Sequence, residues 1–135
     1  MEDCLFCKIV KGELPSSKLY EDEDTLAFLD LFPVNKGHSL VIPKEHYETI
    51  FDVPSEILSK VSPVMKNVAD AVKKGVNADG ISIAQSNGKD AGQVIPHIHF
   101  HVMPRFKDDG LKLWPQGKYE EGEMDKFKEE ISKFL

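Results

Sequence analysis

The chain has 135 residues, of which 41% are hydrophobic and 30% are charged, a balance typical of one globular domain and not of a disordered or collagen-like chain. Its formal net charge is −6 and no basic stripe stands out, so we expect no general nucleic-acid binding. No apolar run approaches the roughly 20 residues of a membrane-spanning helix, and no basic segment of a secretory signal begins the sequence. We therefore expect a cytoplasmic protein with a single domain over 1–135.

The N-terminal half of the chain predicts three strands and a long helix. Two short strands are expected at 18–20 and 25–30, around an acidic turn, and a third at 38–42. In 54–74 the apolar residues recur at steps of three and four, which predicts a helix with one buried face. Pro63 lies inside that pattern, so we expect a kink or a split in the helix there.

The C-terminal half predicts two more strands and a second helix. The strands are expected at 80–85 and 95–103, joined by a glycine-containing loop at 86–94. An amphipathic helix is expected at 123–135. Short connections between the strands favour antiparallel pairing, so the fold class is α+β.

The most informative motif is the run of three histidines His97, His99 and His101 at alternate positions of the last strand. Because side chains alternate along a strand, the three imidazoles should project from one face. A core gains little from three polar rings, so the motif points to chemistry. Either the three rings hold a catalytic zinc ion, or one imidazole is a nucleophile that its neighbours assist.

Two cysteines, Cys4 and Cys7, form a C-x-x-C pair, which is too few for a disulfide scaffold. A structural zinc ion takes four tetrahedral ligands, and His46 with His97 would complete a Cys₂His₂ set. His99 and His101 would then stay free for catalysis. A redox pair, or two cysteines with no metal, remains the alternative interpretation.

The loop before the histidines and the end of the second strand suggest a nucleotide. Glycines at 88 and 92 let backbone amides turn inward around an anion such as a phosphate. Asp30 is placed to accept both hydroxyls of a ribose, although capping a turn is its commoner role.

Taken together, these motifs resemble the histidine triad (HIT) superfamily, in its Hint-like branch. The resemblance spans about 4–105, and 106–135 is much less diagnostic. It rests on the segments CLFCKIV at 4–10, AFLD at 27–30, GHSLVIPKEH at 37–46, AGQ at 91–93 and HIHFHVM at 97–103.

The resemblance implies a five-stranded antiparallel sheet with two main helices, assembled as a homodimer. It makes His99 the nucleophile on the α-phosphorus of a purine nucleotide, with His101, expected to be protonated, at the phosphate and the leaving group. Zinc-containing bacterial members carry the ligand pattern found here, so we expect one structural Zn²⁺ on Cys4, Cys7, His46 and His97. The residues expected to bind or order the substrate are Phe6, Ile9, Phe28, Asp30, Leu31, His38, Asn87 and Gln93.

Two positions depart from the family pattern. Ser86 stands where many members have Asn, and Val94 stands where a hydroxyl residue commonly follows the AGQ segment. The expected activity is hydrolysis or transfer at purine nucleoside phosphoramidates or acyl-adenylates through a nucleotidyl-histidine. The alternatives are a dinucleoside polyphosphate hydrolase and a nucleotide-binding adaptor without catalysis.

Overall fold

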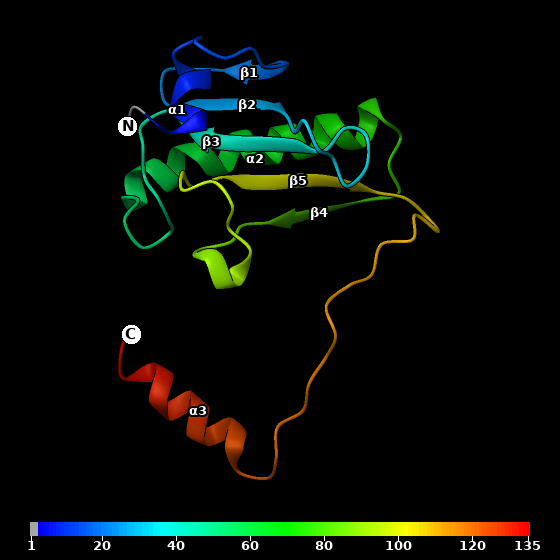
Figure 1. Cartoon of the computed structure of the whole chain (residues 1–135). Coiled ribbons are helices and arrows are strands. Elements are labelled where there is room, and N and C mark those ends of the chain that lie inside the picture. The colour runs from blue at the N-terminus through cyan, green and yellow to red at the C-terminus, as the bar shows by residue number, and fades with distance from the viewer. Residues whose placement is uncertain (1–2) are drawn as a thin grey trace.

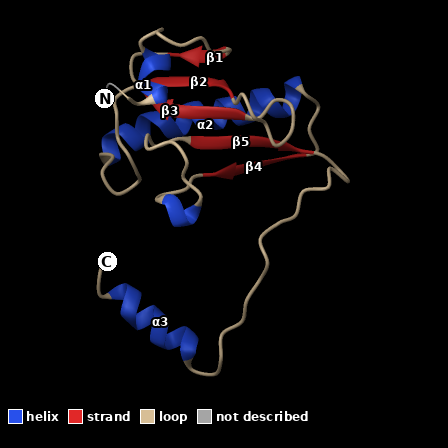
Figure 2. Cartoon of the chain, in the orientation of Figure 1, coloured by secondary structure: helices blue, strands red, loops and turns tan. Residues whose placement is uncertain are grey.

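Five strands pair in a single antiparallel sheet with the order β1-β2-β3-β5-β4 (Figure 2). The structure is a computed structural model, and it describes residues 3–135. The strands are β1 (Lys18–Glu21), β2 (Thr25–Leu29), β3 (Ser39–Pro43), β4 (Gly80–Ala84) and β5 (Phe100–Arg105). The α+β class and the five-stranded antiparallel sheet predicted from the sequence are confirmed.

Each face of the sheet supports its own hydrophobic core, because alternate residues of β2 and β3 point to opposite sides. Leu26 and Phe28 pack on one face with the short helix α1 (Leu5–Val10). Ala27 and Val41 pack on the other face with the long helix α2 (Ser55–Gly75). Figure 1 shows the two helices on opposite sides of the sheet.

The helix α2 runs without a break from Ser55 to Gly75, so the expected split at Pro63 is wrong. The proline side chain is exposed, whereas four valines on the opposite side of the helix are buried against the sheet. Pro63 removes one backbone hydrogen bond, at a cost of about 3 kcal/mol in a helix interior. Burial of four valines stabilises the helix by roughly 6 kcal/mol or more, which exceeds that cost.

Two local elements differ from the sequence prediction. The last strand begins at Phe100, not at residue 95, because Pro96 has no amide proton and the amide of Ile98 donates to the Tyr47 carbonyl, 2.7 Å away. Helix α1 was not expected. At its start the amide of Cys7 donates to Cys4 Sγ at 3.4 Å, so the C-x-x-C pair itself caps the helix.

After β5 the chain leaves the sheet as an extended arm that ends in helix α3 (Glu123–Ser132), seen below the body in Figure 1. The root of this arm is fixed: Asp109 Oδ2 accepts from Arg105 Nε at 2.7 Å and from Asn35 Nδ2 at 3.1 Å. The guanidinium of Arg105 holds the pKa of Asp109 well below its usual range. Among residues 3–135, no helix has the length and apolar character needed to cross a bilayer.

Candidate active site and metal-binding group

All five histidines of the chain gather in one continuous cluster. The rings of His46 and His97 lie 5.0 Å apart between centroids, and those of His99 and His101 lie 4.9 Å apart. His38 joins the cluster through a contact of 2.9 Å between its Nε2 and Nδ1 of His101. The cluster therefore brings β3, the segment after it and the segment leading into β5 to one place.

The position of the proton on His99 follows from its neighbours. Nδ1 lies 2.7 Å from the backbone carbonyl of His97, and a carbonyl only accepts, so Nδ1 carries the proton. In the neutral ring, Nε2 then has a free lone pair. Burial lowers the pKa of His99 from its ordinary value, which favours the neutral ring. This tautomer leaves Nε2 of His99 unprotonated, the form that a nucleophilic imidazole requires.

A longer chain of contacts leads from the backbone through His38 to His101. The amide of Val34 donates to Nδ1 of His38 at 3.1 Å, so neutral His38 carries its proton on Nε2. Nε2 of His38 lies 2.9 Å from Nδ1 of His101. A proton donated across this contact from His38 would leave the neutral His101 ring with its own proton on Nε2, where it could be donated to a phosphate or a leaving group.

The surroundings of His101 favour its neutral form, and the protonated form expected at a bound phosphate stays a prediction. Burial, together with the neighbouring rings of His99 and His38, lowers its pKa to about 4. A second proton on Nδ1 would also oppose the donor that faces it from His38. The neutral ring is therefore the favoured form of His101.

Cys4, Cys7, His46 and His97 form a group whose ligand atoms all lie within 4.8 Å of one another. Cys4 Sγ lies 3.4 Å from Nδ1 of His97, and Cys7 Sγ lies 3.4 Å from Nδ1 of His46. The four residues come from the N-terminal segment with α1, the segment after β3 and the segment before β5. This group could hold a metal ion, as the sequence predicted.

The four donors fit a tetrahedral zinc ion. With Zn–S near 2.3 Å and Zn–N near 2.0–2.1 Å, a tetrahedral angle separates sulfur from nitrogen by about 3.6 Å, close to the separations just given. His97 also donates from Nε2 to the Pro43 carbonyl at 2.8 Å, which leaves the Nδ1 lone pair free for a metal. Burial lowers the pKa of His97 to about 4, so the ring has the neutral form that a ligand needs.

The competing interpretation, a zinc ion held by His97, His99 and His101, does not fit. Across residues 3–135 the ligand atoms of these three side chains form no common group. Nδ1 of His97 faces the two cysteines, while Nδ1 of His99 is engaged by a carbonyl and Nδ1 of His101 by His38. The three rings therefore face different partners.

The residues expected to bind the nucleoside lie next to the histidines. Phe6, Ile9 and Phe28 are buried in the core around α1, and Phe6 packs on both His97 and His99. Leu31 is 82% exposed. Asp30 is half-buried; its Oδ1 accepts from the amide of Phe32 at 2.9 Å, and its Oδ2 lies 3.5 Å from His38 Nε2. Their contacts with a nucleotide remain predictions.

The glycine loop differs from the anion cradle that the sequence suggested. Gly88 and Gly92 both have positive φ, and the short helix η1 (Lys89–Ala91) lies between them. However, the loop's own acceptors already pair the amides of Gly88, Ala91, Gly92 and Gln93. These four amides are not available to a phosphate in this conformation.

Asn87 and Gln93 brace this loop. The amide of Gln93 accepts from Gly88 N at 2.8 Å and donates to the Glu48 carbonyl at 2.7 Å. Asn87 Oδ1 accepts from the amide of Ile50 at 2.7 Å. Both side chains tie the loop to the segment after His46, so their first role in this structure is to position the loop.

Comparisons with known proteins identify the family of this chain. The family model for the HIT domain matches residues 11–108. This chain belongs to the HIT family. It is similar to adenosine 5′-monophosphoramidase HNT1 of Schizosaccharomyces pombe, with 40% identity over 131 residues that cover 96% of each chain.

Solved HIT structures are also similar to this chain. A HIT family protein from Bacillus subtilis superposes with a TM-score of 0.92 at 36% identity, covering 98% of this chain and 97% of that one. A zinc-bound histidine triad family protein from Mycobacterium smegmatis has a TM-score of 0.78 at 41% identity, covering 87% of this chain and 85% of that one.

The contacts that sequence reasoning missed in this HIT chain are made by the backbone. The carbonyls of Pro43 and His97 and the amide of Val34 fix the protons on three histidines. Every residue has backbone groups, so no residue type in the sequence indicates which of them contact a histidine. Only the tertiary structure determines which backbone groups face these rings.

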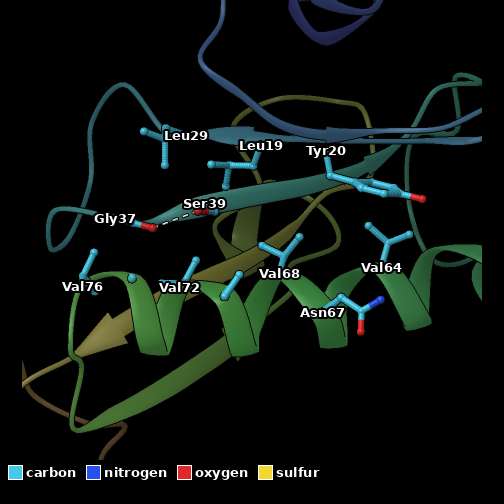
Figure 3. A pocket seen from close by; sticks show the side chains of 12 residues that line it. Leu19, Tyr20, Leu29, Gly37, Ser39, Val64, Asn67, Val68, Val72 and Val76 are labelled. Atoms are coloured by element: carbon cyan, nitrogen blue, oxygen red, sulfur yellow. Dashed lines mark hydrogen bonds between the residues drawn. The ribbon is translucent and has the colours of Figure 1, made fainter.

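An apolar groove of this HIT chain lies elsewhere, between β1 and α2 on the opposite face of the sheet (Figure 3). Leu19 and Leu29 from the strands face Val68 and Val72 from the helix, and at one end Ser39 Oγ donates to the Gly37 carbonyl. No histidine lines the groove, so it is separate from the histidine cluster.

Proposed function

We propose that this chain hydrolyses purine nucleoside phosphoramidates or acyl-adenylates at the α-phosphorus. The observation that carries the proposal is the 2.7 Å contact between His99 Nδ1 and the His97 carbonyl, which leaves His99 Nε2 as a free nucleophile. Nε2 would attack phosphorus and expel the amine or carboxylate, giving a nucleotidyl-histidine. Water would then attack phosphorus and release the nucleotide and His99.

His101 would assist from the neighbouring position. Its Nε2 proton would be donated to a phosphoryl oxygen or to the leaving group as charge develops there. The substrate-binding residues remain those named from the sequence, with Asp30 on the ribose and the cluster around Phe6 against the base. A buried site strengthens such hydrogen bonds because the local dielectric is low.

The name of the fission-yeast relative, an adenosine 5′-monophosphoramidase, supports the phosphoramidate as substrate class. A dinucleoside polyphosphate hydrolase remains the second candidate, since the same attack at the α-phosphorus would serve it. A non-catalytic adaptor is less well supported. A protein that only binds nucleotides would not need a His99 tautomer with an unprotonated Nε2, or a proton donor beside that ring.

We further propose that the metal group holds one structural Zn²⁺. When bound, zinc would tie the N-terminal segment to the segment that carries His99. Its four protein ligands leave no position for water or substrate, so the ion would take no part in the reaction. The fit of the four donors and the zinc-bound relative from Mycobacterium smegmatis support this proposal.

We also propose a cytoplasmic homodimer. Helix α3 presents Met124, Phe127 and Ile131 to solvent, and the outer edge of β4 has no strand beside it among the described residues. An apolar helix stripe and a free strand edge on the same side of the body suit a second copy of the same chain.

The decisive experiment for the catalytic proposal is to trap the intermediate. The protein is mixed with an adenosine phosphoramidate for less than one turnover, quenched, digested and analysed by mass spectrometry. An adenylate adduct on His99 is the expected result. Turnover with no adduct on any histidine, even under single-turnover conditions, would contradict the nucleotidyl-histidine.

A further inference from the structure

His38 connects the loop at 31–34 to the proton donor of the histidine cluster. Its Nδ1 accepts from the Val34 amide at 3.1 Å, and its Nε2 meets Nδ1 of His101 at 2.9 Å. We propose that the backbone amide of Val34, acting through His38, sets which nitrogen of His101 carries the proton. This inference deepens the proposed function, because it makes Val34 and His38 positioning residues for that reaction.

The contact between the two rings does not by itself decide the tautomer. His38 can donate from Nε2 to His101, or His101 can donate from Nδ1 to His38, and the 2.9 Å separation suits both. In the first arrangement His101 presents a proton on Nε2. In the second it presents a lone pair there, and it can no longer donate to a phosphate.

The Val34 amide favours the first of these two arrangements. In the second arrangement the neutral His38 ring carries its proton on Nδ1, where it would point at the amide proton of Val34. Two facing donors in a buried site would leave both unsatisfied, so this arrangement is disfavoured. Asp30 Oδ2, 3.5 Å from His38 Nε2, also favours a proton on that nitrogen.

The loop that supplies the amide is itself a surface element. Leu31 and Phe32 are 82% and 88% exposed, and the loop is held at its start by the bond from Phe32 N to Asp30 Oδ1. The proposed nucleoside contacts, Asp30 and Leu31, belong to the same segment. Contacts to the nucleoside would therefore hold the amide that prepares His101 for proton donation at the phosphate.

The test measures the tautomers directly in the full-length protein labelled with ¹⁵N-histidine, without any nucleotide. Two-bond ¹H–¹⁵N correlation spectra distinguish a protonated ring nitrogen from an unprotonated one. We expect both His38 and His101 to carry the proton on Nε2. A proton on Nδ1 of either ring in the wild-type protein would overturn the proposal.

Variants at Val34 test whether its amide causes the tautomer preference. Val34→Pro removes the amide proton, and Val34→Ala is the matched control that keeps it. In Val34→Pro the Nδ1 resonances of His38 and His101 should move from the wild-type positions toward the midpoint between the two tautomers, whereas Val34→Ala should keep them. Unchanged resonances in a folded Val34→Pro protein would overturn the proposal.

His38→Asn provides the second route if Val34→Pro does not fold. The shorter Asn side chain keeps an acceptor for the Val34 amide but no longer reaches His101. The spectrum of His101 should then show a mixture of its two tautomers. A His101 spectrum identical to that of the wild type would contradict the inference. Because no substrate is present, these results do not depend on whether phosphoramidates are hydrolysed, and failure of the proposed activity is recognised separately by the adduct experiment.

Discussion

The ring of Phe6 packs edge-on against the imidazole of His99, with the centroids 5.2 Å apart and the planes at 82°. Phe6 belongs to α1, between the two cysteines of the metal group. The proposed nucleophile is therefore supported from one side by the helix that, with its N-cap, carries two of the proposed metal ligands. This contact links the proposed zinc ion to catalysis without placing zinc in the reaction.

The first prediction concerns the metal. Cys4→Ser and Cys7→Ser should each reduce bound zinc from about one ion per chain and lower the melting temperature, because a terminus tied by the metal would fray. Activity should fall as Phe6 and His99 lose their support. Lys11→Ser, an exposed change just after the same helix, is the matched control. A metal-free protein with full stability would contradict the zinc assignment.

The second prediction concerns the nucleophile. His99→Ala should abolish phosphoramidate hydrolysis while leaving AMP affinity within about tenfold of wild type, because the base and ribose contacts lie on other residues. Stopped-flow turnover and calorimetric titration of AMP measure the two effects. Hydrolysis at a near wild-type rate would remove His99 from this role.

The third prediction concerns Asp30. Asp30→Ala should weaken AMP binding by roughly 1.5–3 kcal/mol, the range for hydrogen bonds to a charged group. The loss should be much smaller for the 2′,3′-dideoxy analogue, which has no hydroxyls to contact the carboxylate. Equal losses for both ligands, measured by titration calorimetry, would mean that Asp30 acts only through its bond to the Phe32 amide.

The fourth prediction concerns pH and stability. Burial, with His99 and His38 nearby, lowers the pKa of His101 to about 4, below the 6.5 of an exposed histidine. Between these values the unfolded chain binds a proton that the folded chain does not. The stability from this group is therefore present above pH 6.5 and is lost as the pH falls toward 4.

Urea unfolding of wild type and His101→Asn between pH 7 and 4.5 measures this effect. The free energy of unfolding should fall more steeply with decreasing pH in the wild type, by roughly 1–3 kcal/mol over the window. Protonation of the metal ligands affects both proteins alike, so the comparison removes it. Parallel curves would show that His101 titrates normally in the folded state.

The fifth prediction concerns the arm. Phe127→Glu should shift the protein from dimer toward monomer, because it places a charge on the exposed apolar stripe of α3. Lys128→Glu, on the same helix, is the control and should leave the dimer intact. Light scattering coupled to size-exclusion chromatography measures the mass. A wild-type monomer at micromolar concentration would contradict the proposed homodimer.

The sequence alone determined the features that depend on local pattern. The apolar spacing of α2 predicted the long helix, because side-chain direction follows from backbone periodicity. The alternation at 97–101 singled out the three histidines, although only His101 lies in strand β5. The C-x-x-C pair with His46 and His97 predicted the metal group, because a zinc site needs a fixed number of nitrogen and sulfur ligands.

Tertiary structure decided the features that depend on which backbone groups meet. The protons on His97, His99 and His101 are placed by Pro43, the His97 carbonyl and, through His38, Val34. A carbonyl or an amide has the same chemistry at every position, so no sequence pattern marks the one that will face an imidazole. The continuity of α2 through Pro63 was likewise decided by packing, since burial of the helix's apolar face against the sheet outweighs one missing hydrogen bond.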